Sequence, residues 1–506
     1  MTDDVPTAHV EASTRAGRVR GAWRDIPGTA VRSAAFLGIP FAKPPVGDLR
    51  FAAPVPVAPW EGVRDALAFG ATAQRGDPGV TLIPEPSVPG PSTLNVNVFT
   101  PAPGDTAARL PVLVWIHGGG YFAGSPASPW YDGRSFNRDG VVTVSISYRL
   151  GFDGFGWIED APSNRGVRDW LLALEWVQEN IAAFGGDPGR VTIAGQSAGG
   201  GAVLTLLGMP AAQHLFHSVY ALSGATADVA PARAEALGLD IAARLGVAPT
   251  RAGLSAVSEE GILEAQKAAT DISGPDALSR MAEEGLGLGP TIDGDLITRP
   301  TLESLRAGVG ADKPLVLGAT DDEFTMALAE AAGTLRWIPL SVLLGRVGLR
   351  GAARKAYLAA NRDVVRRGHA AVLGRYLTDR MFRTGVVTTA RARGAAPTWV
   401  YRYSFRSTQP GMVRGLAVHC IDVPFWFDCL DPLQPEGSVQ LDNLTGPNPP
   451  QSLADATHAA AVALVVDGDP GWPAWSATPG TARVFGGPAG TTADVTGAYA
   501  SVAALL

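Results

Sequence analysis

Ser197 lies in the stretch Gly195-Gln196-Ser197-Ala198-Gly199, which fits the pattern G-x-S-x-G. A serine hydroxyl is a weak nucleophile at neutral pH, so a protein that uses one must expose it beside a base and near hydrogen-bond donors. Glycines on both sides allow a tight strand-to-helix turn, with the serine at its apex and the first amides of the helix close by. The pattern therefore predicts nucleophilic chemistry at Ser197, although a chain with 61 glycines also offers such a pattern by chance.

A second glycine-rich stretch, His117-Gly118-Gly119-Gly120-Tyr121, directly follows the apolar segment 111–116. Successive glycines let backbone N–H groups approach a ligand without side chains in the way. Such donors stabilise the negative oxygen that forms during acyl transfer. We expect an oxyanion-binding loop here, and the alternative is a flexible turn after a strand.

The segments around these two stretches alternate between strand and helix patterns. Strands are predicted at 95–100, 111–116, 141–148, 191–196, 219–224, 315–318 and 399–405, and a helix is predicted at 169–184. The segments 17–21 and 30–40 predict an antiparallel pair at one edge of the sheet. Alternation of this kind is typical of an α/β fold with a large, mostly parallel central sheet flanked by helices.

Two further tracts, about 228–285 and about 325–393, have a helical pattern and interrupt the series of strands. No internal repeat and no low-complexity linker divides the 506 residues. We therefore predict a single domain over residues 1–506, with the two tracts as helical insertions.

Composition argues against several classes of protein. Hydrophobic residues make up 46% of the chain and charged residues 18%, which fits a packed globule and argues against long disorder. The net charge of -7, without a local basic cluster, gives no attraction to nucleic acid or to an anionic membrane surface. Arginine supplies nearly all of the 41 basic residues, which we interpret as a compositional bias without functional content.

The sequence also bears on the compartment. No segment reaches the roughly 18 apolar residues of a membrane span. Residues 1–15 lack the apolar core of a secretory signal, so we expect a cytoplasmic protein. Cys420 and Cys429 could form one disulfide at most, and we expect both to be reduced thiols.

Beyond single motifs, the chain resembles the type-B carboxylesterase family, the α/β-hydrolases that also include cholinesterases and bacterial para-nitrobenzyl esterases. The resemblance covers about residues 15–480. It rests on Gly38-Ile39-Pro40-Phe41-Ala42, Pro44-Pro45-Val46-Gly47 and the segments 115–120, 164–169, 173–181 and 184–188. It implies the α/β-hydrolase fold, with helical insertions around the mouth of the active site.

The resemblance implies a role for each of seven residues. They are Ser197 as nucleophile, Glu323 as acid, His419 as base, Gly119, Gly120 and the Ala198 amide as oxyanion hole, and Ser223 as a support for the acid and base. The order nucleophile, acid, base along the chain is that of α/β-hydrolases.

The choice of base and acid can be checked against the other residues of the same types. His369 and His458 also follow the acid, but both lie in predicted helices, where a solvated side chain is the simplest explanation. His419 lies in a loop after a strand, as a base requires. Of the adjacent carboxylates Asp321, Asp322 and Glu323, we expect two to be solvated, because burying three like charges together is costly.

The chain departs from the family pattern at four places. Gly90-Pro91-Ser92-Thr93 replaces an acidic pair and a cysteine, Gln196 replaces a glutamate, Phe324 replaces a glycine, and Cys420 follows the base. The first departure removes the basis for an ion pair and a disulfide. None removes a catalytic group, and we expect Phe324 to affect how the acid is held.

These observations together predict a serine carboxylic ester hydrolase that works through an acyl-enzyme, without a metal or cofactor, on a small-molecule ester and water. The alternatives are an amide, carbamate or lactone hydrolase with the same residues, and a non-catalytic binding protein of the same fold. The oligomeric state stays open.

The substrate class is the least determined feature. Phe425 and Trp426 either line an apolar substrate pocket or pack in the core. Cholinesterases, which the chain resembles, hold a quaternary ammonium on an aromatic residue of the loop that corresponds to 75–93, and this loop has no Trp, Tyr or Phe here. We therefore expect neutral, apolar esters.

Overall fold

One mixed sheet of thirteen strands runs through the computed structural model, which describes residues 8–73, 81–271, 287–432 and 435–506. The strands are β1 (His9–Ser13), β2 (Arg18–Asp25), β3 (Arg32–Pro40), β4 (Val63–Asp65), β5 (Asn95–Thr100), β6 (Leu110–Ile116), β7 (Val142–Ile146), β8 (Gly186–Gln196), β9 (Ser218–Leu222), β10 (Leu315–Thr320), β11 (Thr398–Tyr403), β12 (Thr481–Phe485) and β13 (Ala493–Thr496). Their order across the sheet is β1-β2-β3-β5-β7-β6-β8-β9-β10-β11-β12-β13, with β4 beside β2.

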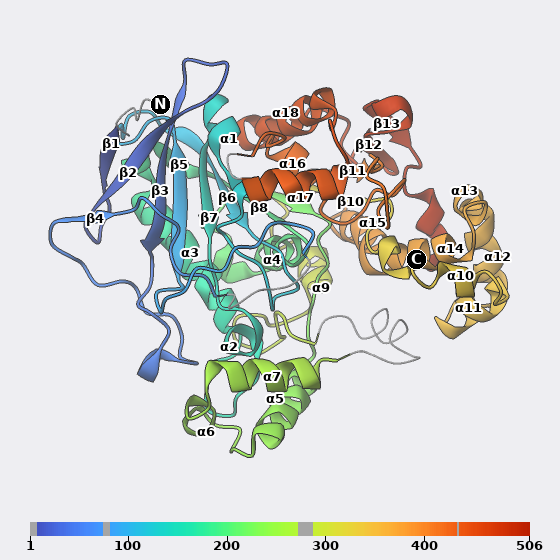
Figure 1. Cartoon of the computed structure of the whole chain (residues 1–506), viewed down its shortest axis with the longest axis horizontal. Coiled ribbons are helices and arrows are strands. Elements are labelled where there is room, and N and C mark those ends of the chain that lie inside the picture. Colours follow the sequence, from blue (N-terminus) through green and yellow to red (C-terminus); the bar gives the residue numbers. More distant parts are fainter. Residues whose placement is uncertain (1–7, 74–80, 272–286, 433–434) are drawn as a thin grey trace.

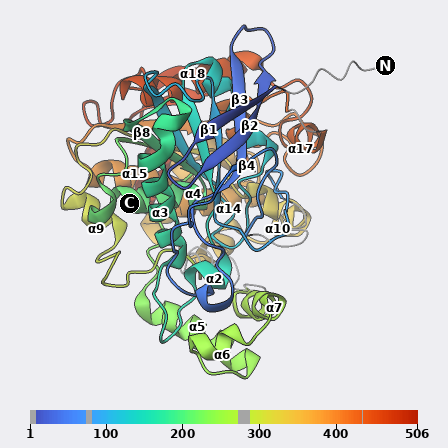
Figure 2. The same ribbon diagram turned by 90° about the vertical axis from the view of Figure 1, so that its left-hand side faces the viewer.

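The centre of the sheet is parallel and its edges are antiparallel. Neighbouring strands from β7 to β12 pair in parallel, whereas β1, β2, β3 and β5 on one side and β13 on the other pair antiparallel. Figure 2 shows the antiparallel edge, with β1 to β4 turned toward the viewer. The sequence predicted this architecture, including the antiparallel pair at the edge.

Helices cover both faces of the sheet and also form two projections (Figure 1). They are α1 (Arg134–Arg138), α2 (Gly151–Phe155), α3 (Arg165–Asn180), α4 (Ala198–Leu207), α5 (Pro231–Leu245), α6 (Arg251–Ser255), α7 (Glu259–Ala269), α9 (Thr301–Arg306), α10 (Ala332–Leu335), α11 (Leu340–Arg346), α12 (Gly351–Ala360), α13 (Arg362–Val365), α14 (His369–Thr378), α15 (Thr384–Ala392), α16 (Val423–Trp426), α17 (Pro435–Thr445) and α18 (Gln451–Asp467). A π-helical turn, η6 (Asp379–Arg383), joins α14 to α15.

Two apolar clusters fill the space between the sheet and these helices. One contains residues of α3, α4 and α15, and the other contains residues of α1, α16 and α18 on the opposite face. Strand β6 is buried on both sides from Pro111 to Ile116, as a central parallel strand covered by helices must be.

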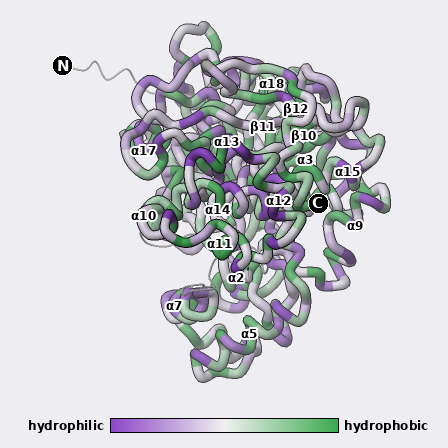
Figure 3. Tube along the Cα trace, turned by 90° about the vertical axis from the view of Figure 1, so that its right-hand side faces the viewer, coloured by the Kyte–Doolittle hydropathy of each residue, from purple (hydrophilic) through white to green (hydrophobic). Residues whose placement is uncertain are grey.

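The two helical tracts predicted from the sequence form projections on the body of the molecule. Helices α5 to α7 lie at the bottom of Figure 1, and α10 to α13 lie at its right. Residues 272–286, which belong to the first tract, lie outside the described residues. Figure 3 shows hydrophilic stretches on α12 and α13, the outward helices of the second projection.

The register of the parallel strands places their carboxyl ends side by side. Ile116 of β6 lies opposite Gly195 of β8, Gln196 of β8 lies opposite Leu222 of β9, and Leu222 in turn lies opposite Gly318 of β10. The segments that follow these strands therefore emerge at one edge of the sheet. That edge carries every residue for which the sequence predicted a catalytic or supporting role, and His419 reaches it through the loop after β11.

The bounds of helix α3 differ from those predicted. The sequence predicted a helix over 169–184, but α3 covers Arg165–Asn180 and a 3-10 turn covers Ile181–Phe184. Gly185 then has φ +80° and its N–H bonds to the carbonyl of Ala182, which ends the helix and lets β8 begin at Gly186.

Candidate active site

Ser197 lies between β8 and α4 with φ 58° and ψ -120°, a conformation that few residues with a side chain adopt. The turn is tight on both sides. A Cβ on Gly195 would lie 2.4 Å from the carbonyl oxygen of Gly199, and a Cβ on Gly199 would lie 2.0 Å from that of Ile116. The side chain of Ser197 stays partly exposed. The local geometry is thus the one that the motif predicted.

The glycine loop after β6 lies directly against this turn. A Cβ on Gly118 would come within 3.2 Å of Cβ of Ser197. Gly119 has φ +105°, and a Cβ there would lie 2.1 Å from the carbonyl oxygen of Ala123. Within the described part of the chain, the N–H groups of Gly119 and Gly120 have no hydrogen-bond acceptor. Two unused donors therefore belong to the loop that contacts the Ser197 turn.

His117 supports the glycine loop from below. Its Nδ1 lies 2.9 Å from the carbonyl oxygen of Gly118, and its ring stacks on Tyr148 with 4.5 Å between the ring centroids. Burial lowers the pKa of His117 to about 4, so this imidazole is neutral at pH 7.

Glu323 and His419 meet at the same edge of the sheet. The Glu323 carboxylate accepts a hydrogen bond from Nδ1 of His419 through Oε2. Its other oxygen, Oε1, accepts bonds from the hydroxyl of Ser223 at 2.7 Å and from the backbone N–H of Thr320 at 2.8 Å. The acid that the resemblance implied is thus the one that contacts the histidine, and Ser223 holds that acid.

Backbone contacts fix the two loops to each other. The N–H of His419 donates to the carbonyl of Glu323 at 2.9 Å, and the N–H of Asp322 donates to the carbonyl of Ala417, also at 2.9 Å. The N–H of Ala417 donates to Oδ2 of Asp322 at 3.3 Å. These bonds hold the loop of the base in register with the loop of the acid.

The imidazole of His419 has three further neighbours. Its Nε2 lies 3.0 Å from the amide nitrogen of Gln196. The ring centroids of Phe324 and Phe382 lie 4.7 Å and 5.1 Å from the centroid of the imidazole. The sequence marked Gln196 and Phe324 only as departures from a family pattern. Phe382 carries no local signal, because it reaches the site from the π-helical turn η6.

Burial and charge act in opposite directions on His419. Burial by itself would lower the pKa of His419, but the proximity of Cys420 and the charge and hydrogen bond of Glu323 raise it well above its usual value. Burial also raises the pKa of the Cys420 thiol, so this group is uncharged at neutral pH and Glu323 is the lasting cause. The result favours the imidazolium, which is the form a base must reach during proton transfer.

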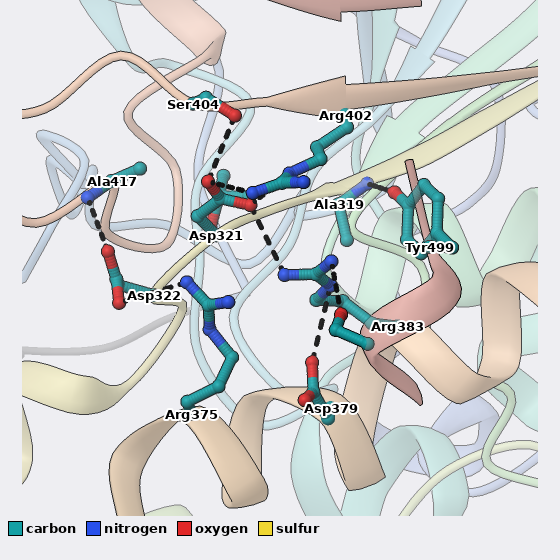
Figure 4. Close-up of polar contacts among 12 residues, drawn as sticks. Ala319, Asp321, Asp322, Arg375, Asp379, Arg383, Arg402, Ser404, Ala417 and Tyr499 are labelled. Atoms are coloured by element: carbon teal, nitrogen blue, oxygen red, sulfur yellow. Dashed lines mark hydrogen bonds and ion pairs between the residues drawn. The ribbon is translucent and has the colours of Figure 1, made fainter. Parts of the chain in front are cut away.

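All three adjacent carboxylates are buried, which corrects the prediction that two of them are solvated. Asp321 is 2% exposed, and Asp322 and Glu323 are 0% exposed. Figure 4 shows the reason: arginines from α14, η6 and β11 surround Asp321 and Asp322. The contacts are Arg402 to Asp321 at 2.6 and 2.8 Å, Arg383 to Asp321 at 3.2 Å, Arg367 to Asp322 at 3.1 Å and Arg375 to Asp322 at 3.4 Å.

These arginines also correct the interpretation of arginine as mere compositional bias. Burial alone would raise the pKa of Asp321, but the charges of Arg402 and Arg375 hold it well below its usual value. Like charges can therefore lie side by side here because each carboxylate has its own cationic partner.

Phe425 and Trp426 lie in the core, which is the second of the two placements considered for them. Phe425 is 0% exposed and Trp426 is 1% exposed. The Trp426 ring packs at 5.2 Å from Trp115 of β6 and at 5.4 Å from Tyr220 of β9, on the face covered by α16 and α18. Nothing in this packing supports a contact with substrate.

His458, expected to be solvated, is buried instead. It lies in α18, where Nδ1 contacts the carbonyl of Trp426 at 2.8 Å and Nε2 contacts Asp139 at 3.0 Å. The prediction was wrong because α18 turns this position toward α16 and not toward solvent. His458 links two helices on the face opposite α4.

Both cysteines are free and buried, as the sequence predicted for reduced thiols. Burial raises the pKa of Cys429 to about 12.

In the described part of the chain, no three His, Cys, Asp or Glu side chains gather in a way that could hold a metal ion. Among the same residues, none of the helices has both the length and the apolar composition that crossing a bilayer requires.

The chain is similar to known esterases over most of its length. A model of the carboxylesterase family matches residues 6–434. The para-nitrobenzyl esterase of Bacillus subtilis (strain 168) is 32% identical over 459 residues, which cover 87% of this chain and 88% of that protein. The liver carboxylesterase of Sus scrofa is 33% identical over 436 residues, covering 79% and 76%.

The fold agrees with this relationship. The crystal structure of the carboxylesterase EST55 of Geobacillus stearothermophilus matches with a TM-score of 0.75 and 31% identity, covering 98% of this chain and 99% of that one. The chain thus has the α/β-hydrolase fold, belongs to the carboxylesterase family and is a carboxylic ester hydrolase of the serine hydrolase class.

Proposed function

We propose that this carboxylesterase uses Ser197 as nucleophile, His419 as base and Glu323 as the acid that orients the base. The observation that carries this proposal is the place of the His419 imidazole. Its Nδ1 contacts the Glu323 carboxylate, and its Nε2 faces the end of β8, one residue before Ser197. No other histidine of the described residues lies at that edge beside a buried carboxylate and the serine turn.

In the first half of the reaction, the hydroxyl of Ser197 attacks the ester carbonyl while Nε2 of His419 takes its proton. Glu323 keeps the other ring proton on Nδ1 and balances the charge of the imidazolium. Ser223 and the N–H of Thr320 both donate to Oε1 of Glu323, which holds the carboxylate so that Oε2 faces His419. His419 then returns the proton to the departing alcohol, which leaves an acyl group on Ser197.

The carbonyl oxygen becomes negative during this attack and requires donors. The N–H groups of Gly119, Gly120 and Ala198 are the oxyanion hole in this proposal. The free N–H groups of Gly119 and Gly120 and the contact of Gly118 with the serine turn support this role. Ala198 is the first residue of α4, so its N–H has no acceptor within the helix.

Water completes the cycle. His419 removes a proton from water, the water oxygen attacks the acyl-enzyme, and the acid is released together with the free hydroxyl of Ser197. Amides, carbamates and lactones could pass through the same steps, and the family relationship favours esters over them. A non-catalytic role is disfavoured, because the nucleophile, acid and base are all present.

For the substrate we propose neutral, apolar esters. The names of two relatives, para-nitrobenzyl esterase and liver carboxylesterase, suggest para-nitrobenzyl esters and simple carboxylic esters as the first to test. A cytoplasmic location remains a proposal drawn from the sequence.

The nucleophile is tested by substitution and by labelling. Ser197→Ala should lower kcat on an aryl ester by on the order of 10³-fold or more and leave the fold intact. A sulfonyl fluoride should add to Ser197, as read by peptide mapping. An adduct on Ser223, or full activity of Ser197→Ala, would refute the assignment.

A further inference from the structure

Gln196 holds the atom of His419 that Ser197 needs. The amide nitrogen of Gln196 lies 3.0 Å from Nε2 of the imidazole, and the residue is only 1% exposed. In contrast, the hydroxyl of Ser197 makes no hydrogen bond with any residue in the described part of the chain. In this structure the base is therefore engaged by the neighbour of the nucleophile and not by the nucleophile itself.

When Glu323 is ionised and His419 is neutral, the chemistry of the three groups sets the direction of this bond. The ionised carboxylate of Glu323 can only accept, so Nδ1 of His419 carries the ring proton. In the neutral imidazole, Nε2 then has a single lone pair in the ring plane, and the amide of Gln196 donates to it. Ser197 cannot donate to the same lone pair at the same time.

The amide of Gln196 has a defined place between the base and the glycine loop. A Cβ on Gly118 would lie 3.0 Å from Oε1 of Gln196 and 2.8 Å from its carbonyl oxygen. The backbone of Gln196 is held by its pairing with Leu222 at the end of β8. The contact with His419 is thus built into the end of the central strand.

We propose that Gln196 is a positioning residue that occupies His419 in the free enzyme, so that Ser197 acquires its base only when ester binding displaces the amide. This inference rests on the proposed roles of Ser197 and His419. It predicts that Ser197 of the free enzyme reacts more slowly than it would if no amide were bonded to His419.

The type of residue at 196 matters because an amide can serve both states of the base. Its NH₂ group donates to the neutral imidazole, and after rotation its carbonyl accepts from the imidazolium. A glutamate in this place could only accept, and would favour the charged imidazole. The other ionisable groups that face His419 are Glu323, Cys420 and Asp422, and they are the same in all variants below.

The first test measures the reactivity of the free enzyme. Gln196→Met keeps the length of the side chain and removes its hydrogen-bonding groups. The variant should be inactivated about two- to tenfold faster by methanesulfonyl fluoride, the factor expected for loss of one competing hydrogen bond. Methanesulfonyl fluoride is small, so it makes few of the contacts that an ester would make with the enzyme. The measurement is made at a pH on the plateau of the kcat/KM profile.

The second test measures the pH profile and does not depend on the first variant. Gln196→Glu should move the acidic limb of kcat/KM upward by about 1 to 3 pH units, because a nearby carboxylate favours the imidazolium. Gln178→Met is the matched control. Gln178 is a partly buried glutamine of α3 whose amide donates to the carbonyls of Pro188 and Leu215, remote from the site. Its variant should change neither the inactivation rate nor the pH profile.

The outcomes separate this inference from the proposed function. An adduct on Ser197 combined with an unchanged or slower rate in Gln196→Met would overturn the role of Gln196 alone. An unmoved acidic limb in a folded Gln196→Glu variant would do the same. An adduct at any residue other than Ser197 in the unmodified enzyme would overturn the proposed function, and this inference with it.

Discussion

At the scale of single residues, His419 contacts more of the site than any other side chain described above. It bonds to Glu323 through Nδ1 and to Gln196 through Nε2, and two phenyl rings lie against it. A side chain held in this way keeps one tautomer and one orientation, which general-base catalysis requires. Substitution of a residue that contacts the His419 ring should therefore lower kcat more than substitution of a neighbour that does not contact it.

Substitutions of the neighbouring carboxylates Glu323 and Asp322 should have very different effects on kcat. Glu323→Gln should lower kcat by about 10³- to 10⁴-fold, since an amide can stabilise the wrong tautomer of the base. Asp322→Asn keeps the shape of its side chain and does not touch the ring, so its folded fraction should keep kcat within about tenfold. Steady-state kinetics with active-site titration measures both, and equal losses would reject Glu323 as the orienting acid.

The pH dependence of activity follows from the raised pKa of His419. Activity requires the neutral imidazole, so kcat/KM is lost as pH falls through the pKa of the free enzyme. Because Glu323 raises that pKa, the loss should begin above about pH 6.5, the usual value for histidine. A pH series with a neutral ester measures the midpoint. A midpoint well below 6.5 would contradict the charge interaction described here.

At the scale of elements, buried ion pairs tie the helical insertion to the sheet. Asp321 and Asp322 follow β10, Arg402 belongs to β11, Arg375 to α14 and Arg383 to the π-helical turn η6. Because Glu323 and Phe382 lie on the same segments, this network also sets the distance between the acid and the phenyl ring beside the base. The arginines thus have a structural function that composition alone did not reveal.

Asp321→Asn should destabilise the protein strongly, because it removes the buried charge that Arg402 and Arg383 share, and Arg383 keeps only Asp379. The expected loss is about 3–5 kcal/mol in the free energy of unfolding, measured with urea at about pH 7. The folded pKa of Asp321 lies below its usual value, so its contribution is complete above about pH 4 and declines as pH falls further. The difference between the variant and the unmodified protein should therefore shrink below about pH 4.

A surface pair provides the control for this measurement. Asp240 and Arg244 form an exposed ion pair on α5, at 2.8 Å. Asp240→Asn should cost about 0.5 kcal/mol or less, since water and salt screen such pairs. If both aspartate variants lost the same stability, the buried network would have no special weight.

At the scale of the whole molecule, the site is assembled from five separate segments of one sheet. The glycine loop after β6, Ser197 after β8, Ser223 after β9, Glu323 after β10 and His419 after β11 meet because parallel strands end at the same edge. Substrate preference depends on what surrounds this edge, including the segment 75–93, of which residues 75–80 lie outside the described residues. That the chain is a single domain stays a prediction.

The absence of an aromatic residue from 75–93 predicts no preference for choline esters. A desolvated contact between a cation and an aromatic ring is worth about 2 kcal/mol, or roughly 30-fold in binding. Butyrylcholine should therefore have no higher kcat/KM than its uncharged isostere, 3,3-dimethylbutyl butyrate. A clear advantage of the cation in this comparison would show that another group provides the missing contact.

The sequence by itself determined the local features of this protein. The turn at Ser197, the glycine loop at 118–120 and the alternation of strands and helices all follow from the chemistry of neighbouring residues, so short patterns were sufficient to predict them. The tertiary structure alone decided which distant side chains meet. The pairs Glu323 with His419 and Gln196 with His419 span 96 and 223 residues of chain. The burial of Asp321 and Asp322, and the place of Trp426 in the core, likewise depend on partners that strand register and helix packing bring from elsewhere, which no local pattern encodes.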